Sequence, residues 1–474
     1  MSVVKRIYQN TLYLSIAEVI SRVLQFAVML WAARYLVPQE FGAFNFALAL
    51  AFVAMIVADM GLSQLLVRTV ARDRQALKKY LINALYLKAW LCVLMFFLLW
   101  GILLGLGYRD QTLDLALLML IFAILGTFTE FIYSIFRSFE RMEFDSMLKI
   151  TRMALLALLS FIVLVRGYGV LAFSWMFVVV EFIVVLLGFL IVSKNFRVHL
   201  TITNLDSVYR IKMLKDAIPF GLAALFGNSY FYLAIFILSV MKGELEVAYY
   251  SSAYNIALAL LFIPTVFTNA LYPVLSRSYT HAKQQMTTLY EKGVKYLLII
   301  SLPIGLVLLV YAEHIMHLLY GQRYDMAIIV LRMFAFFVLL KFINFMLGMT
   351  LSSTDRQWER MKAQGMVAGL NVLICMGLIW GYGYKGAAWG VLITEVVLLA
   401  VYYNYARQAA GQIKGEVIAR PLFAGMIMLV CLIFISIHWI MSIFIAGAVY
   451  VIALVAVGAF DKEDQKIWEA TLKK

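Results

Sequence analysis

The chain has 474 residues, of which 64% are hydrophobic and 14% are charged. A water-soluble protein of this size is nearer half apolar and a quarter charged, so the composition excludes a soluble globular domain and a disordered chain. The formal net charge of +14 at pH 7 is better explained by Lys and Arg in the cytoplasmic loops of a membrane protein than by nucleic-acid binding.

The apolar runs predict an all-α polytopic membrane protein with 14 transmembrane helices. A helix needs about 20 residues to cross a hydrocarbon core of about 30 Å, and charge clusters and glycine turns divide the chain into segments of that length. The first run contains Glu18 and Arg22 and is too long for a cleaved signal peptide. The expected spans are 12–36, 42–68, 81–107, 112–137, 146–166, 169–193, 215–241, 246–272, 292–312, 325–350, 360–382, 385–409, 417–438 and 440–459.

Lys and Arg alternate between the two sides of these spans. Thirty of the 40 fall on the side that holds both termini, six fall on the opposite side and four lie inside spans. Because cytoplasmic loops carry the excess of positive charge, both termini are predicted to be cytoplasmic. A span missed in the middle of the chain would invert the bias beyond the error.

Two parts of the chain resemble each other at an offset of 214 residues. A Gly-Tyr-Gly turn is followed in both by a tryptophan and a glutamate: Gly167 to Gly169, Trp175 and Glu181, then Gly381 to Gly383, Trp389 and Glu395. Each repeat holds six spans, so the halves are parallel and related by a pseudo-twofold axis along the membrane normal, as in transporters. The predicted domains are six-helix bundles over 1–200 and 201–412, then a terminal helix pair with a cytoplasmic tail over 413–474.

Short motifs follow one another in order along the chain: Asn10-Thr11-Leu12, Ala33-Arg34-Tyr35-Leu36, Glu40-Phe41-Gly42, Asp59-Met60-Gly61-Leu62, Arg68, Pro219 and Ala270-Leu271-Tyr272-Pro273. Together they resemble the polysaccharide-transporter family, flippases for O-antigen and other lipid-linked oligosaccharides. That family is part of the multidrug/oligosaccharidyl-lipid/polysaccharide exporter superfamily. Fourteen spans favour its polysaccharide and lipid II branches over the multidrug branch, whose members typically have 12.

The resemblance implies export of a polyprenyl-diphosphate-linked glycan across the cytoplasmic (inner) cell membrane by alternating access, for cell-surface polysaccharide synthesis. It implies a central cavity lined by spans 1, 2, 7 and 8, and a terminal helix pair that accommodates the lipid tail. A proton or sodium ion as coupling ion, and a polysaccharide polymerase or glycosyltransferases as partners, are compatible with it. Many relatives carry an acidic residue midway along span 7, where this chain reads Asn228 to Tyr232, which puts a coupling role at that position in doubt.

Cationic side chains inside a span are candidate functional residues, because each costs a few kcal/mol or more in lipid. Arg22 is the first candidate for the diphosphate, since a guanidinium matches phosphate oxygens with two parallel donors. The alternative is that Glu18, four residues earlier on the same helical face, neutralises it. Lys341 is a second candidate, with pairing to Glu130 as its alternative. Lys88 is expected to extend its ammonium from a span end to the headgroups.

Four acidic side chains are candidates for ion coupling, because a carboxyl in a low dielectric binds a proton more readily and an ionised one suits sodium: Asp59, Glu130, Glu181 and Glu395. For Asp59 the alternative is a structural contact with span-end amides or with Arg68. For Glu181 and Glu395 it is a shared structural role in the two repeats. Polar side chains on spans 7 and 8 are candidates for stacking on and hydrogen-bonding sugars, against an interfacial aromatic belt: Asn228, Tyr230, Tyr232, Tyr250, Tyr254 and Asn255.

No cofactor, metal site or enzymatic activity is expected. Glu313, His314 and His317 offer too few metal ligands, and the chain lacks the Gly-Lys-Ser/Thr loop that cradles ATP phosphates. Two alternative functions stay open. A cation-coupled multidrug exporter of the same superfamily is disfavoured by the terminal spans and by Arg22. A membrane glycan polymerase or ligase generally needs a sizeable outward loop with catalytic carboxylates, which these spans do not leave room for.

Overall fold

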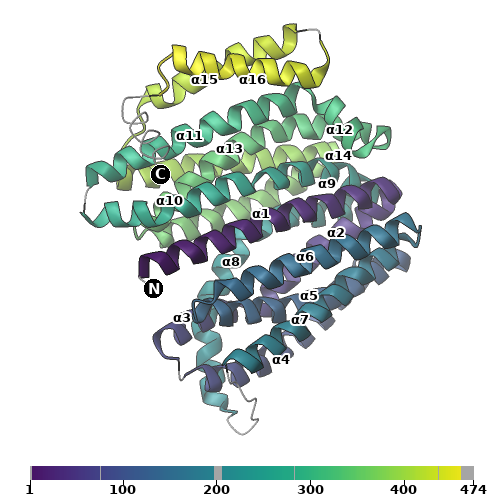
Figure 1. Cartoon of the computed structure of the whole chain (residues 1–474). Coiled ribbons are helices and arrows are strands. Elements are labelled where there is room, and N and C mark those ends of the chain that lie inside the picture. Colours follow the sequence, from purple (N-terminus) through teal and green to yellow (C-terminus); the bar gives the residue numbers. More distant parts are fainter. Residues whose placement is uncertain (1–2, 75, 197–204, 282, 436, 461–474) are drawn as a thin grey trace. The chain divides into compact units, whose positions relative to one another are not determined.

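The computed structural model describes residues 3–74, 76–196, 205–281, 283–435 and 437–460, and at positions 3–9, 11, 76, 78, 196, 228–231, 273, 280, 281, 283 and 284 it describes the backbone alone. The described residues form helices and no strand (Figure 1). The elements are α1 (Val3–Tyr35), α2 (Pro38–Asp59), α3 (Leu62–Arg72), α4 (Ala76–Gly105), α5 (Asp110–Ser138), α6 (Met142–Val165), α7 (Gly169–Phe196), α8 (Ser207–Lys242), α9 (Glu244–Leu260), α10 (Phe262–His281), α11 (Lys283–Val310), α12 (Ala312–Tyr320), the 3-10 helix η2 (Gln322–Ala327), α13 (Ile328–Ser353), α14 (Gln357–Ala410), α15 (Gly415–Phe434) and α16 (Trp439–Ala456).

The membrane character of the fold is confirmed. Within the described residues, 12 helices are long and apolar enough to cross a membrane, or 13 if the two bent arms of α8 form one span. α14 has 54 residues and a non-helical Gly383 (φ 56°, ψ −135°) in its middle. A straight helix of that length would measure about 80 Å, more than twice the hydrocarbon thickness, so Gly383 divides α14 into two arms. The count of 14 spans depends on α8 and α14, and stays a prediction.

The expected span over 42–68 is wrong in its last third, after Asp59. α2 ends at Asp59, where Met60 (φ 43°) and Gly61 (φ 85°) take left-handed conformations, and α3 begins at Leu62 as a separate helix. Gly61 tolerates this conformation because it has no Cβ. α3 turns one apolar face inward, so the residues after Asp59 are an amphipathic helix and not the end of a span.

The chain divides into two compact units, residues 1–255 with 368–387 and residues 256–367 with 388–474. In the first unit α1 packs against α6, and α2 packs against both α5 and α8, while α5 also contacts α7. In the second unit α11 contacts α13 and α15, and α15 forms a hairpin with α16. The predicted domain boundaries at 200 and 412, and the pseudo-twofold relation, stay predictions.

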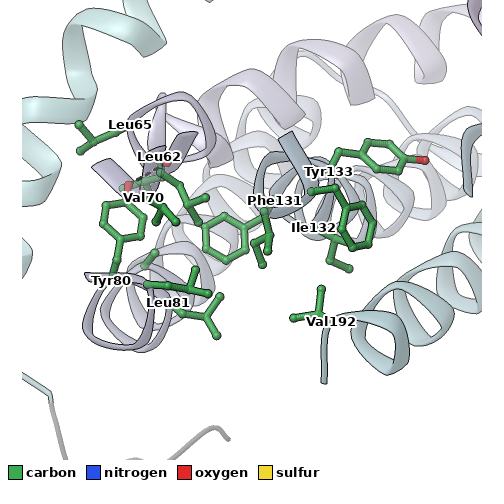
Figure 2. Packing of buried hydrophobic residues seen from close by; sticks show 14 of the residues in the cluster. Leu62, Leu65, Val70, Tyr80, Leu81, Phe131, Ile132, Tyr133 and Val192 are labelled. Carbon is green, nitrogen blue, oxygen red and sulfur yellow. Dashed lines mark hydrogen bonds between the residues drawn. The ribbon is translucent and has the colours of Figure 1, made fainter. Parts of the chain in front are cut away.

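A buried apolar cluster fixes α3 within the first unit. Figure 2 shows side chains of α3, α4, α5 and α7 in this cluster, including Leu62, Tyr80, Phe131 and Val192. The Tyr80 hydroxyl donates a hydrogen bond of 2.8 Å to the carbonyl oxygen of Leu62, which satisfies the buried phenol. The start of α3 is therefore held against α4.

The N-terminus of α8 is tied to α4 by a capping aspartate. Asp206 accepts a hydrogen bond from the Tyr209 backbone N–H (3.0 Å) and one from Lys79 Nζ (3.0 Å). These two donors, the backbone N–H first, hold the pKa of the Asp206 carboxyl below its ordinary value. Asn83 also accepts a hydrogen bond from the Asp206 backbone N–H (3.1 Å), so α8 starts from a fixed point on α4.

Candidate functional site

A cavity of about 250 Å³ in the first unit is lined by three cations and one carboxylate. Arg22 and Glu18 come from α1, and Lys149 and Arg152 come from α6. The remaining lining is polar or apolar: Ser21, Gln25, Val28, Met29, Leu48, Phe52, Phe122, Met153, Leu156, Phe177 and Tyr232. We call this space the cationic cavity.

Arg22 pairs with Glu18, and it also faces the cationic cavity. Its Nε donates to Glu18 Oε1 at 2.9 Å, and the Arg22 side chain stays 42% exposed. The two sequence interpretations of Arg22 are therefore compatible. The pair uses Nε, and the terminal guanidinium nitrogens form no other hydrogen bond within the described part of the chain.

Lys149 and Arg152 were missed by the sequence reasoning, which counted both with the loop around 137–152. They are part of α6, and with Met153 and Leu156 they line the cavity from one face of that helix. Residues three and four apart share a helical face, so the spacing Lys149, Arg152, Met153, Leu156 was the available signal.

Each cation of α6 is paired with a buried carboxylate outside the cavity lining. Arg152 Nε lies 2.7 Å from Glu181 Oε2 on α7, and the Glu181 side chain is 1% exposed. Lys149 Nζ lies 3.0 Å from Asp145 Oδ1, one turn earlier on α6. Glu181, a candidate for ion coupling, is thus placed directly behind the cationic cavity.

A second cavity, of about 320 Å³, carries acidic side chains and lies in the same unit. Asp59 and Glu130 line it, beside Ser63, Gln64 and Thr127. We call it the acidic cavity. Phe52 and Tyr232 line both cavities, with stacked rings whose centroids are 5.0 Å apart. Tyr232 is therefore the span-7 candidate that reaches a cavity, while the side chains of Asn228 and Tyr230 are outside the described residues.

Asp59, at the end of α2, is paired with Lys88, which the sequence analysis expected to reach the headgroups. Its carboxylate accepts the Ser63 backbone N–H at 3.3 Å, which agrees with the expected span-end contact, and it pairs with Lys88. Lys88 also donates to Thr127 Oγ1 (2.6 Å), and its side chain is 0% exposed. The expectation that Lys88 reaches the headgroups is wrong, because the buried ammonium is fully bonded inside the helix bundle.

Glu130 connects to the cationic cavity through a chain of ion pairs. Glu130 Oε1 lies 2.7 Å from Arg137 Nη1, and Arg137 Nε lies 2.7 Å from Asp145 Oδ2, the carboxylate that also holds Lys149. Within the second unit, Lys341 is bonded to Glu395 (2.9 Å). Its suggested pairing with Glu130 of the first unit stays a prediction.

Glu395 has a more complete set of partners than Glu181, its counterpart in the repeat. Besides Lys341, the Asn344 amide donates to its Oε2 at 2.8 Å and to its backbone oxygen at 3.1 Å.

Tyr250 and Tyr254 are buried, at 0% and 2% exposed, with stacked rings 5.6 Å apart, and Asn255 is half-buried beside them. Their role as sugar contacts stays a prediction.

A family model described as polysaccharide biosynthesis protein matches residues 7–279, more than half of the chain. The chain belongs to this family. A second model, MatE, matches residues 219–376. The expected family is thereby confirmed, and the protein is a multi-pass membrane transporter of the multidrug/oligosaccharidyl-lipid/polysaccharide exporter superfamily.

Two curated relatives have names that refer to glycan synthesis. The capsular polysaccharide biosynthesis protein CapF of Staphylococcus aureus is 21% identical over 407 residues, which is 84% of this chain and 99% of CapF. The probable low-salt glycan biosynthesis flippase Agl15 of Haloferax volcanii is 20% identical over 180 residues, 38% of each chain.

Solved structures share the fold of this chain. The lipid II flippase MurJ in an inward closed conformation matches with a TM-score of 0.77 at 16% identity, over 94% of this chain and 98% of MurJ. An inward-facing multidrug resistance MATE transporter matches with a TM-score of 0.62 at 19% identity, over 82% of this chain and 94% of the other.

Proposed function

We propose that the protein is a flippase that moves a polyprenyl-diphosphate-linked oligosaccharide across the cytoplasmic membrane by alternating access, for cell-surface polysaccharide synthesis. The observation that carries this proposal is the cationic cavity, where Arg22, Lys149 and Arg152 face one space with Glu18 as the single lining carboxylate. A diphosphate is the anionic part of such a lipid, and guanidinium groups bind its oxygens with charge-assisted hydrogen bonds. The names of CapF and Agl15 support the same class of substrate.

In this proposal some residues of the cationic cavity supply positive charge to the diphosphate, and others orient the substrate through polar contacts. Arg22 offers the terminal nitrogens that Glu18 leaves unused, and Lys149 offers an ammonium as a point charge. Gln25 and Tyr232 add polar groups that can bond the first sugar. In this proposal both termini are cytoplasmic, the cavity loads from the cytoplasmic side, and the protein performs no covalent chemistry.

Transport into proteoliposomes tests the proposal. The purified full-length protein is reconstituted with a lipid-linked oligosaccharide bearing a fluorescent sugar, and its arrival in the opposite leaflet is followed with a membrane-impermeant quencher. The wild type should equilibrate the lipid between leaflets, and Arg152→Ala should slow this at least tenfold. Arg332→Ala, which removes an exposed span cation of α13 that is not among the lining residues of the cationic cavity, is the matched control and should transport normally.

A multidrug exporter is the second candidate, and the acidic cavity is the observation that favours it. Asp59 and Glu130 would attract organic cations, and the MatE model matches residues 219–376. A strain without the gene separates the two functions. The flippase proposal predicts lipid-linked glycan accumulating in the cytoplasmic leaflet with its synthesis intact. Normal glycan export combined with increased drug sensitivity would contradict that proposal and support the multidrug function.

A further inference from the structure

Glu181 depends on one cation, and that cation faces the cationic cavity. The Glu181 side chain is 1% exposed, and among the described residues Arg152 is the cation within ion-pair distance of it. Its ion pair with Arg152, at 2.7 Å, is therefore its compensating contact in the described structure. Arg152 is 19% exposed and lines the cavity. A ligand that binds Arg152 therefore weakens the contact that compensates the negative charge of Glu181.

Two other buried carboxylates are better protected. Asp145, at 0% exposed, is held by Arg137 at 2.7 Å and by Lys149 at 3.0 Å, so it keeps one cation if Lys149 turns to a ligand. Glu395, also at 0% exposed, is held by Lys341 at 2.9 Å and by the Asn344 amide at 2.8 Å, and neither of these side chains lines the two cavities. Of these three buried carboxylates, Glu181 is the most sensitive to an anion in the cationic cavity.

We propose that a diphosphate bound in the cationic cavity draws Arg152 away from Glu181, and that Glu181 then takes up one proton from water. This inference rests on the proposed function, since it needs an anionic ligand in that cavity. The step is an exchange of partners: the Arg152 guanidinium passes from a carboxylate to phosphate oxygens, and a proton neutralises the carboxylate that is left. An isolated buried carboxylate is too costly to stay ionised. If Arg152 instead bridges both anions, the nearby phosphate charge still disfavours the ionised form of Glu181.

Among the described residues around Glu181, no second cation lies within ion-pair distance that could neutralise it in place of a proton. From α5, Tyr133 and Glu130 act electrostatically on the Arg152–Glu181 pair. From α6 come Asp145, Lys149 and Arg152, of which Arg152 is the cation within ion-pair distance of Glu181 in the described residues. α2, which also packs against α7, carries no titratable side chain between Glu40 and Asp59. Glu130 and Asp145 add negative charge, which favours proton uptake further.

The inference has a quantitative consequence for binding. When a ligand raises the pKa of one group, its affinity falls about tenfold for each pH unit between the two pKa values of that group. In a probe with a terminal phosphate, such as farnesyl diphosphate, that phosphate gains negative charge above about pH 6, which acts in the opposite direction. A comparison of variants with the same ligand removes this contribution, because the phosphate titrates in every sample.

Calorimetry with farnesyl diphosphate tests the inference on the purified full-length protein. Titrations in buffers of different ionisation enthalpy give the number of protons taken up per ligand bound. The wild type should take up about one proton more than Glu181→Gln, which cannot be protonated in this way. Glu181→Gln should also bind more tightly than the wild type at pH 8, because no carboxylate competes for Arg152. Glu395→Gln, the matched control in the second unit, should keep the wild-type proton number.

The outcomes separate the inference from the proposed function. Equal proton numbers for the wild type and Glu181→Gln would overturn the inference while leaving diphosphate binding intact. Failure of the wild type to bind farnesyl diphosphate would overturn the proposed function together with the inference. An infrared difference spectrum of the wild type needs no variant: a protonated-carboxyl band should appear when the ligand binds. Its absence would overturn the inference even if Glu181→Gln does not fold.

Discussion

Arg22 is too weakly paired for its ion pair alone to explain a charge within α1. An exposed pair of residues four apart on a helix contributes about 0.3–0.5 kcal/mol, whereas a charged side chain inside a span costs about 2.5–3.5 kcal/mol on insertion scales. Arg22 and Glu18 are 42% and 31% exposed, so this low value applies to them. The pair alone does not offset this cost, and diphosphate binding by Arg22 in the cationic cavity is our prediction for the remainder.

Substitutions at Arg22 separate binding from structural pairing. Arg22→Ala should abolish glycan export while the protein still accumulates in the membrane, and Arg22→Lys should retain part of the activity, because it keeps the charge but loses the bidentate fork. Export is measured as surface polysaccharide in cells complemented with each variant, and protein amount by immunoblot. If Arg22 serves only to neutralise Glu18, the double change Glu18→Ala with Arg22→Ala should recover export, and that recovery would remove the phosphate-binding role.

Lys88 represents the opposite case, a cation with a structural task. It is completely buried and bonded to Asp59 and Thr127, so Lys88→Met leaves Asp59 without its cation at the end of α2. Breaking a buried pair from one side costs about 3–5 kcal/mol. Thermal unfolding in detergent should show this loss, and Lys88→Met with Asp59→Asn should recover much of it. A single variant as stable as the wild type would contradict this assignment.

The sequence identified Arg22, Lys88 and Lys341 as cations within spans, but it missed Lys149 and Arg152, and it did not identify partners on other helices. Arg22 and Glu18 share one helix, so their spacing was enough. Arg152 with Glu181, and Lys341 with Glu395, join different helices, and their pairing depends on how each helix is rotated in the packed bundle. Helical periodicity predicts which face of its own helix a residue lies on, but it does not predict which neighbouring helix that face contacts. The positions of spans followed from apolar length, whereas the break after Asp59 depends on a left-handed turn within an apolar run.

Among the elements, the turn between α2 and α3 depends on close contact with α8. A Cβ built at Gly221 of α8 would lie 2.6 Å from the Met60 carbonyl carbon, and one at Gly61 would lie 2.5 Å from the Gly221 nitrogen. The two backbones therefore touch without side chains between them. This contact gives a physical reason for the Asp59-Met60-Gly61-Leu62 motif, since Gly61 supplies both the left-handed conformation and the space.

Alanine substitutions test this contact with an internal control. Gly221→Ala should lower the free energy of unfolding by about 1–3 kcal/mol, because the added methyl meets backbone that cannot rotate away. Gly101→Ala in α4 should cause no loss, because its Cβ would meet no atom within 4 Å. Both are measured by thermal unfolding in the same detergent. Equal stability of the two variants would show that α8 does not approach the turn this closely.

At the scale of the whole molecule, the number of spans depends on α8 and α14. If α8 crosses the membrane once and α14 crosses twice about Gly383, 14 spans result and both termini share one side. If α8 did not cross, Lys242 would lie on the side of Arg72. If α14 crossed once, Lys414 would lie on the side opposite Arg356. The bias of Lys and Arg toward the side of the termini favours the first arrangement, because it is kept through the last loops of the chain.

Single cysteines at exposed positions decide between these arrangements. Cys92, Cys375 and Cys431 are first replaced by serine, and one cysteine is then placed at Arg72, Lys242 or Lys414. A membrane-impermeant thiol reagent should label position 242 in intact cells, after permeabilisation of any outer membrane. Positions 72 and 414 should react only after the cytoplasmic membrane is opened, because two crossings of α14 return the chain to the cytoplasmic side. Protection of position 242 would remove α8 from the spans. If position 242 is labelled from outside, labelling of position 414 from outside would reduce α14 to one span. Position 72 reports on the reagent in both cases, because α1 and α2 precede it and do not depend on the disputed helices.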